Sequence, residues 1–150
     1  RPEQSRGDPM LDQLLPLERK LELMAGSDYV VVAAPLTRDT RDMIGASELR
    51  AMKKTGVLIN IGRGPVVDES ALIRALQEKW IRGAALDVFE NEPLPQGHPF
   101  YRLDNLLLSP HCADHTSDWM EQATQFFLDN FERFRKGEPL QNVVEKRLGY

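Results

Sequence analysis

Four short apolar runs alternate with segments of helical character, and this alternation limits the chain to few folds. The runs span 28–34, 56–61, 82–88 and 105–108. The first, Asp28-Tyr-Val-Val-Val-Ala-Ala34, is rich in β-branched residues and suits a strand that is covered on both faces, as in a parallel sheet. Strands that alternate with helices indicate βαβ units. The sequence therefore predicts an α/β fold with an open parallel sheet.

Helices are expected between these strands and after the last of them. They span 11–25, 46–53, 69–79 and about 117–135. Asp68 is the expected N-cap of the third helix, whose buried side is expected to carry Leu72, Ile73 and Leu76. In the last helix apolar residues follow steps of three and four, and Gly137 is expected to close it.

The composition is that of an ordinary soluble globular protein, with 41% hydrophobic and 28% charged residues. A net charge of -4 without a basic stripe argues against nucleic acid as a partner. The longest apolar run, 29–36, is too short to span a bilayer, which takes roughly 20 residues. We therefore expect a soluble, cytoplasmic protein without a nucleic-acid or membrane partner. This stretch of sequence carries no information on organelle targeting.

Polar segments follow each of the four predicted strands. They are 34–37, 62–64, 87–93 and 109–111. In open α/β sheets ligands bind at the carboxyl ends of the strands, so these segments point toward one crevice. Together they supply an arginine, two carboxylates and a histidine: Arg63, Asp87, Glu92 and His111. Such a set can bind an anionic substrate and move a proton near neutral pH.

The same segments form a series of four strings. They are Ala34-Pro-Leu-Thr-Arg-Asp-Thr40, Asn60-Ile-Gly-Arg-Gly-Pro-Val-Val-Asp68, Asp87-Val-Phe-Glu-Asn-Glu-Pro93 and Ser109-Pro-His111. The series resembles that of the D-isomer-specific 2-hydroxyacid dehydrogenases, a family that includes glyoxylate/hydroxypyruvate reductases, phosphoglycerate dehydrogenase and formate dehydrogenase. The similarity runs from about Ser27 to Val144. One string alone is a weak signal, whereas four in order make a strong one.

The resemblance implies a role for individual residues. It implies that Arg63 grips the substrate carboxylate and polarises the carbonyl, a task that suits a guanidinium fork. It implies that His111 is the acid/base that protonates the carbonyl oxygen while hydride arrives from the nicotinamide. Glu92 is then the carboxylate that pairs with this histidine and favours imidazolium. The positions implied to contact the cofactor, NAD or NADP, are Ala34, Thr40, Ile61, Gly62, Arg63, Asp87, His111, Cys112 and Ala113.

Some of these assignments compete with simpler interpretations. Asp87 is implied to hydrogen-bond the nicotinamide carboxamide, but a carboxylate at a strand end can also cap the following turn. Cys112 and Ala113 are implied to flank the nicotinamide ring. Because Cys112 is the only cysteine and no spaced His/Asp set accompanies it, neither a disulfide nor a metal site is expected. Glu90 lies two residues before Glu92, and Glu92 is preferred because the Glu-Pro step matches the family pattern.

The glycine-rich turn G-x-G-x-x-G, which binds pyrophosphate in nucleotide-binding folds, does not occur in this sequence. We therefore interpret residues 1–144 as the second half of a doubly wound, Rossmann-like NAD(P)-binding domain with a long C-terminal helix, and residues 140–150 as a tail toward a substrate domain. We expect reduction of a small 2-oxo acid such as glyoxylate or hydroxypyruvate, only as part of a longer chain, and the resemblance implies a homodimer. The alternative is a truncated, non-catalytic family member that acts as a scaffold or oligomerisation module.

Overall fold

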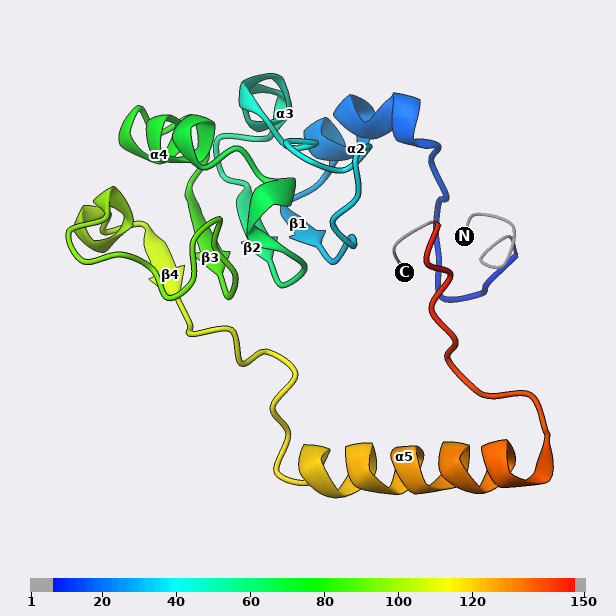
Figure 1. Ribbon diagram of the computed structural model, residues 1–150. Coiled ribbons are helices and arrows are strands. Elements are labelled where there is room, and N and C mark those ends of the chain that lie inside the picture. The colour runs from blue at the N-terminus through cyan, green and yellow to red at the C-terminus, as the bar shows by residue number, and fades with distance from the viewer. Residues whose placement is uncertain (1–6, 148–150) are drawn as a thin grey trace.

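The computed structural model describes residues 7–147, and a parallel sheet of four strands lies at its centre (Figure 1). In spatial order the strands are β1 (Tyr29–Val32), β2 (Val57–Asn60), β3 (Gly83–Leu86) and β4 (Leu106–Leu108). All neighbouring pairs are parallel, so the predicted α/β class and parallel sheet are confirmed. Each strand begins one residue later than predicted. The outermost residues of the predicted domain and tail, 1–6 and 148–150, lie outside the described residues.

Helical segments precede each strand, and one long helix follows the last. They are η1 (Leu17–Arg19), α2 (Lys20–Gly26), α3 (Ala46–Ala51), η2 (Gly64–Val66), α4 (Glu69–Gln77), η3 (Pro99–Arg102) and α5 (Trp119–Lys136). The predicted N-cap of α4 is confirmed, because the Asp68 carboxylate accepts a hydrogen bond from the backbone N–H of Ala71 at 3.0 Å. Gly137 closes α5 in the left-handed conformation, with φ at +71°.

The helix predicted over 11–25 is wrong in its first part. Helical structure begins only at Leu17, as one 3-10 turn that continues into α2. Pro16 explains the late start, because proline lacks a backbone N–H and disfavours helical backbone in the residue before it. The predicted apolar side is also mostly exposed: Leu14 and Leu21 are 46% and 45% exposed, and Met24 alone is buried in α2.

The hydrophobic core lies on the face of the sheet that α2, α3 and α4 cover (Figure 1). Val30, Leu58 and Ala84 form one row across this face and are all buried. The predicted buried side of α4 is confirmed for Leu72 and Leu76, whereas Ile73 is only partly buried. Next to the first row lies a second one, Val32, Asn60 and Leu86, toward the carboxyl ends of the strands. Its middle residue is a buried amide.

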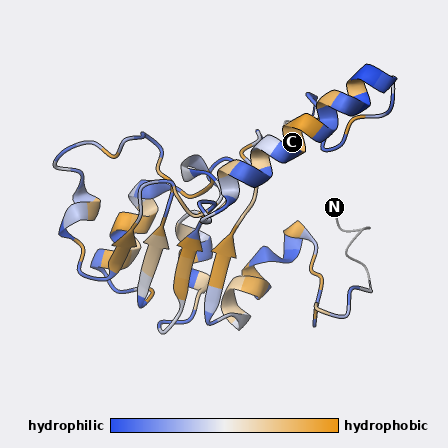
Figure 2. Cartoon of the chain, turned by 90° about the horizontal axis from the view of Figure 1, so that it is seen from below, coloured by the Kyte–Doolittle hydropathy of each residue, from blue (hydrophilic) through white to orange (hydrophobic). Residues whose placement is uncertain are grey.

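The opposite face of the sheet is open, contrary to the prediction of strands covered on both faces. Figure 2 looks onto this face, and no helix of residues 7–147 lies in front of the strands. Tyr29, Val31 and Leu107 are therefore 60%, 55% and 70% exposed. The α5 helix lies apart from the sheet, and its predicted apolar stripe, which includes Phe127 and Phe134, is exposed (Figure 1). No helix in the described part of the chain is long and apolar enough to cross a membrane.

Candidate active site

The predicted site residues lie where the strands end. Arg63 follows β2, Asp87 and Glu92 follow β3, and His111 follows β4. Because the strands are parallel, these loops lie at one edge of the sheet, where open α/β sheets bind ligands. His111 and Glu92 are in direct contact, and the positive charge of Arg63 acts on Glu92. The structure therefore brings Glu92 and His111 into contact and places Arg63 at the same edge of the sheet.

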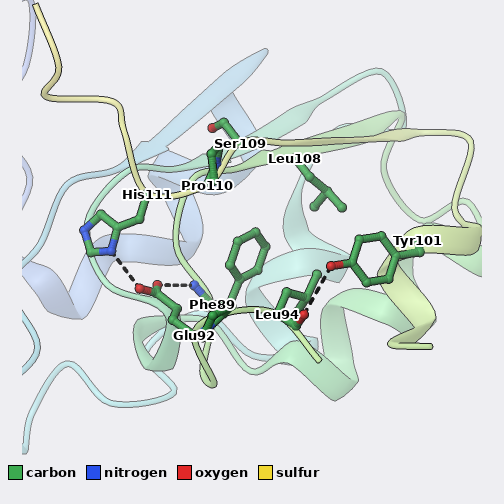
Figure 3. A pocket seen from close by; sticks show the side chains of 9 residues that line it. Phe89, Glu92, Leu94, Tyr101, Leu108, Ser109, Pro110 and His111 are labelled. Carbon is green, nitrogen blue, oxygen red and sulfur yellow. Dashed lines mark hydrogen bonds and ion pairs between the residues drawn. The ribbon is translucent and has the colours of Figure 1, made fainter. Parts of the chain in front are cut away.

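His111 and Glu92 form the central contact of the site (Figure 3). Nδ1 of His111 lies 2.7 Å from Oε2 of Glu92, and the backbone N–H of Phe89 donates to Oε1 at 2.8 Å. Burial raises the pKa of Glu92, but the hydrogen bonds from Phe89 and His111 and the charges of His111 and Arg63 outweigh it and hold this pKa below its ordinary value. An ionised carboxylate only accepts, so Nδ1 carries the shared proton. Nε2 is the ring nitrogen that takes no part in this contact.

Asp87 fastens the loop that carries His111. Ser109 Oγ and the backbone N–H of Cys112 donate to Oδ1 at 2.6 and 2.9 Å, and the backbone N–H of Ala113 donates to Oδ2 at 2.8 Å. Burial raises the pKa of Asp87, but these hydrogen bonds and the charge of His111 lower it below its ordinary value. Between the bonded residues His111 has a φ of +53°, in the left-handed region that residues other than glycine seldom adopt. Asp87 thus stabilises an unusual backbone at the proposed acid/base, while its contact with a carboxamide stays a prediction.

Asn60 holds the turn that carries Arg63, although no role in the site was predicted for it from the sequence. Asn60 is buried, with only 1% of its surface exposed. The Gly62 N–H donates to Oδ1 at 3.1 Å, and Nδ2 donates to the carbonyl oxygen of Arg63 at 3.1 Å. The Arg63 side chain is in turn fixed by a bond from Nη1 to the Gly62 carbonyl oxygen at 2.7 Å. A lone amide in an apolar strand was the available signal, because a buried amide needs partners.

Three of the residues predicted to line the cofactor adjoin one another after β1 and β2. A Cβ atom added to Gly62 would lie 2.8 Å from the carbonyl oxygen of Ala34, so the two backbones pack closely. Ile61, the residue before Gly62, is 45% exposed and adds apolar surface. Thr40 acts within its own loop, since its hydroxyl donates to the Pro35 carbonyl oxygen at 2.7 Å. Its contact with a cofactor stays a prediction.

An open pocket of about 610 Å³ adjoins the His111–Glu92 pair. It is lined by Phe89, Glu92, Pro93, Leu94, Tyr101, Leu108, Ser109, Pro110 and His111. The Tyr101 hydroxyl donates to the Leu94 carbonyl oxygen at 3.2 Å on its apolar side. Figure 3 shows the imidazole edge with Nε2 turned away from this apolar side. The apolar side of the pocket and Nε2 of His111 therefore lie on opposite sides of the His111–Glu92 pair.

The described residues also define what the site does not offer. Within 7–147 there is no group of three or more His, Cys, Asp or Glu side chains that could hold a metal ion. Cys112 is a partly buried free thiol whose backbone N–H bonds to Asp87. The chemistry of the site thus consists of a guanidinium, a histidine and two carboxylates.

The chain is similar to known proteins over most of its length. Residues 6–113 match the model of "D-isomer specific 2-hydroxyacid dehydrogenase, NAD binding domain". The chain is 42% identical to a glyoxylate reductase of Korarchaeum cryptofilum over 136 residues, which are 91% of this chain and 40% of that relative. A D-isomer specific 2-hydroxyacid dehydrogenase from Xanthobacter autotrophicus Py2, solved with NADPH and MES, is 44% identical with a TM-score of 0.82, over 89% of this chain and 55% of that one.

A second solved structure is similar across nearly the whole chain. It is the NADPH-dependent glyoxylate/hydroxypyruvate reductase from Sinorhizobium meliloti in complex with NADP and sulfate, with 29% identity, a TM-score of 0.86, and coverage of 97% of this chain and 48% of that one. The chain spans about two fifths of the length of the curated relatives it matches. It belongs to the D-isomer specific 2-hydroxyacid dehydrogenase family, within the NAD-binding domain that this family shares.

Proposed function

We propose that the protein containing this chain reduces a small 2-oxo acid, of the glyoxylate or hydroxypyruvate kind, with hydride from NAD(P)H. The observation that carries the proposal is the 2.7 Å contact between His111 Nδ1 and Glu92 Oε2, next to the charge of Arg63. Similar proteins named as glyoxylate reductases, and similar structures that hold NADPH or NADP, support the choice of substrate class and cofactor.

Arg63 supplies the positive charge that binds the substrate carboxylate. Its side chain is exposed at the carboxyl edge of the sheet, and its planar fork matches a carboxylate in a bidentate contact. The Asn60 amide and the Gly62 carbonyl group fix the backbone and one guanidinium nitrogen. Because the turn is held in this way, the charge is presented in one orientation, and the carbonyl of the bound acid is oriented with it.

His111 supplies the proton. Because Nδ1–H donates to Glu92, Nε2 is the atom that gives a proton to the carbonyl oxygen as this oxygen becomes a hydroxyl. The ionised Glu92 stabilises the imidazolium form before the transfer. In the reverse direction the neutral Nε2 accepts the hydroxyl proton, so the same pair serves oxidation.

The nicotinamide cofactor, when bound, supplies the hydride. Ala34, Ile61 and Gly62 would hold it, since the backbones of Ala34 and Gly62 pack closely at the carboxyl ends of β1 and β2 and the exposed Ile61 side chain adds apolar surface beside them. A side chain in place of Gly62 would push the two backbones apart, because its Cβ would lie 2.8 Å from the Ala34 carbonyl oxygen. The proposal includes both NAD and NADP.

We also infer a cytoplasmic homodimer in which residues 1–144 are the second half of an NAD(P)-binding domain and residues 140–150 a tail toward a substrate domain. The exposed side chains of Tyr29, Val31 and Leu107 support burial of the open face in an assembly. Sedimentation of the full-length protein tests the dimer, and a monomer at micromolar concentration would contradict it.

A substrate panel tests the proposed reaction. The full-length protein is assayed for oxidation of NADH and NADPH with glyoxylate, hydroxypyruvate and glycolaldehyde. We expect turnover of the two acids and little turnover of glycolaldehyde, which has a carbonyl but no carboxylate for Arg63. Failure to oxidise either cofactor with any 2-oxo acid would overturn the proposal and favour the non-catalytic scaffold, which the open sheet face also supports.

A further inference from the structure

A second carboxylate, that of Glu69, lies behind the Glu92–His111 pair. Glu69 is the first residue of α4, and its side chain is only 14% exposed. Its Oε1 accepts a hydrogen bond from the backbone N–H of Glu90 at 2.7 Å. A backbone N–H that donates to an ionised carboxylate makes a short and strong bond, about twice as strong as a neutral one. Helix α4 is thereby tied to the loop that carries Glu92.

Two consecutive amides of this loop donate to two different carboxylates. The Phe89 N–H donates to Oε1 of Glu92 at 2.8 Å, and the next N–H along the chain, that of Glu90, donates to Glu69. The two N–H groups belong to consecutive peptide groups that share the Cα atom of Phe89. The bond to Glu69 thus anchors the chain directly next to the amide that bonds to Glu92.

The loop is confined on its other sides as well. A Cβ atom added to Gly64 would lie 1.9 Å from the carbonyl carbon of Phe89, so the two backbones are in close contact. The Phe89 ring packs against the buried ring of Phe100, with centroids 6.4 Å apart. Gly64 and Phe100 confine the loop by packing, whereas Glu69 holds it by a hydrogen bond to the 89–90 peptide.

His98 steadies the second oxygen of Glu69. Nε2 of His98 lies 3.6 Å from Oε2 of Glu69, and Nδ1 of the same ring accepts the backbone N–H of Phe100 at 3.3 Å. The His98 and Phe100 rings are also in contact, with centroids 4.6 Å apart. One oxygen of Glu69 is therefore bonded to the loop, and the other faces the imidazole of His98 at the start of η3.

From these contacts we infer that Glu69 is a positioning residue for the reaction: through the Glu90 amide it holds the 89–92 loop in the shape in which Glu92 meets His111. The inference rests on the proposed function only for its effect on catalysis. The structural part, that Glu69 orients the Glu92 carboxylate, stands apart from the identity of the substrate.

Titration of the Glu92 carboxylate in the full-length protein tests the structural part. The protein is ¹³C-labelled at the glutamate side chains, and the Glu92 signal is assigned with Glu92→Gln. In Glu69→Ala the loop loses its anchor, so Glu92 loses its bonds to Phe89 and His111, and its lowered pKa rises toward the ordinary 4.5. Removing a nearby negative charge without moving the loop has the opposite sign and lowers this pKa further. The sign of the change therefore separates positioning from simple electrostatics.

Two further variants distinguish the effect of the length of the Glu69 side chain from the effect of its negative charge. Glu69→Asp keeps the charge but is one methylene shorter, so it is expected to raise the pKa of Glu92 as the alanine does. Glu69→Gln loses the charge but keeps an oxygen that accepts the Glu90 N–H, so the pKa of Glu92 is expected to stay low. The matched control is Glu78→Ala, which removes an exposed carboxylate at the other end of α4 and is expected to change nothing at Glu92. These conservative variants keep the test decisive if the alanine variant does not fold.

The kinetic arm uses the same variants. Reduction of glyoxylate is expected to fall about 10- to 100-fold in Glu69→Asp and to stay near wild type in Glu69→Gln. An unchanged or further lowered pKa of Glu92 in both Glu69→Asp and Glu69→Ala would overturn the inference. If the wild type reduces no 2-oxo acid, the proposed function fails, while the titration still decides whether Glu69 orients Glu92.

Discussion

The Nδ1 atom of His111 lies 2.7 Å from a carboxylate oxygen of Glu92, although the two residues are nineteen positions apart in the sequence. The contact depends on two loops that follow neighbouring parallel strands, β3 and β4. Asp87 fixes the position of His111 through three hydrogen bonds to the residues around it. The backbone N–H of Phe89 fixes the carboxylate of Glu92. Most of the site is therefore held by backbone amides that donate to carboxylates.

Gly64 is predicted to tolerate no side chain. In Gly64→Ala the new Cβ would lie 1.9 Å from the Phe89 carbonyl carbon, so the 89–92 loop must move. We expect the free energy of unfolding to fall by about 3 kcal/mol, the upper part of the usual cost of overpacking. Chemical denaturation measures this. The control is Gly26→Ala in α2, where no atom lies within 4 Å of the added Cβ. Equal stability of the two variants would contradict the close packing of Gly64 against Phe89.

Asn60 is predicted to act on substrate affinity through Arg63. In Asn60→Ala the Gly62 N–H and the Arg63 carbonyl group lose their partner, and the turn that carries the guanidinium loosens. We expect KM for glyoxylate to rise about 10-fold, equivalent to about 1.4 kcal/mol, while kcat changes less. Steady-state kinetics with Asn105→Ala as control, an asparagine that bonds near the other end of the sheet, gives the comparison. A fall in kcat with unchanged KM would contradict the assignment.

Asp87 is predicted to make the stability of the fold depend on pH. The pKa values of Asp87 and Glu92 are below their ordinary 3.8 and 4.5, so the fold favours the ionised forms. The stabilisation is complete above these ordinary values and is lost as the pH falls through the lower native-state values. In Asp87→Asn the free energy of unfolding at neutral pH is expected to fall by about 2 kcal/mol, because one amide oxygen replaces two acceptors.

The pH dependence of Asp87→Asn gives a second, independent readout. Between about pH 6 and about pH 2 this variant is expected to lose less stability than the wild type, since one of the carboxylates that prefer the ionised form is gone. Denaturant unfolding at a series of pH values measures both slopes. Parallel curves would show that Asp87 contributes no such preference.

The sequence was informative where local pattern decides the structure. Apolar runs marked all four strands, and because parallel strands end at one edge, the segments after them could be expected to meet. The contacts that hold those segments in place could not be predicted from the sequence. Asp87 bonds to residues 22 to 26 positions away, and Glu69 to a residue 21 positions away, so both depend on how strands and helix pack. No periodicity in the chain encodes such distances.

Two predictions of the fold were wrong: the start of the helix over 11–25 and the cover on the second face of the sheet. Pro16 was visible, and its effect on the backbone before it outweighs the leucine spacing of 11–25. The covered second face of the sheet was inferred from apolar strands such as 29–32, whereas β1 alternates between exposed and buried residues. A continuous apolar run is typical of a strand with both faces covered, but it does not tell whether the covering element belongs to the same 150 residues.

The most direct test of the proposed chemistry is single-turnover reduction of glyoxylate by the full-length protein with His111 replaced by glutamine. Glutamine keeps a polar side chain, but its amide N–H is not acidic enough to protonate the substrate, so the rate is expected to fall about 100-fold or more, the usual contribution of a general acid. His115→Gln, at an exposed histidine beyond the site, is expected to leave it unchanged. A His111→Gln rate equal to that of the wild type would show that another group protonates the carbonyl oxygen.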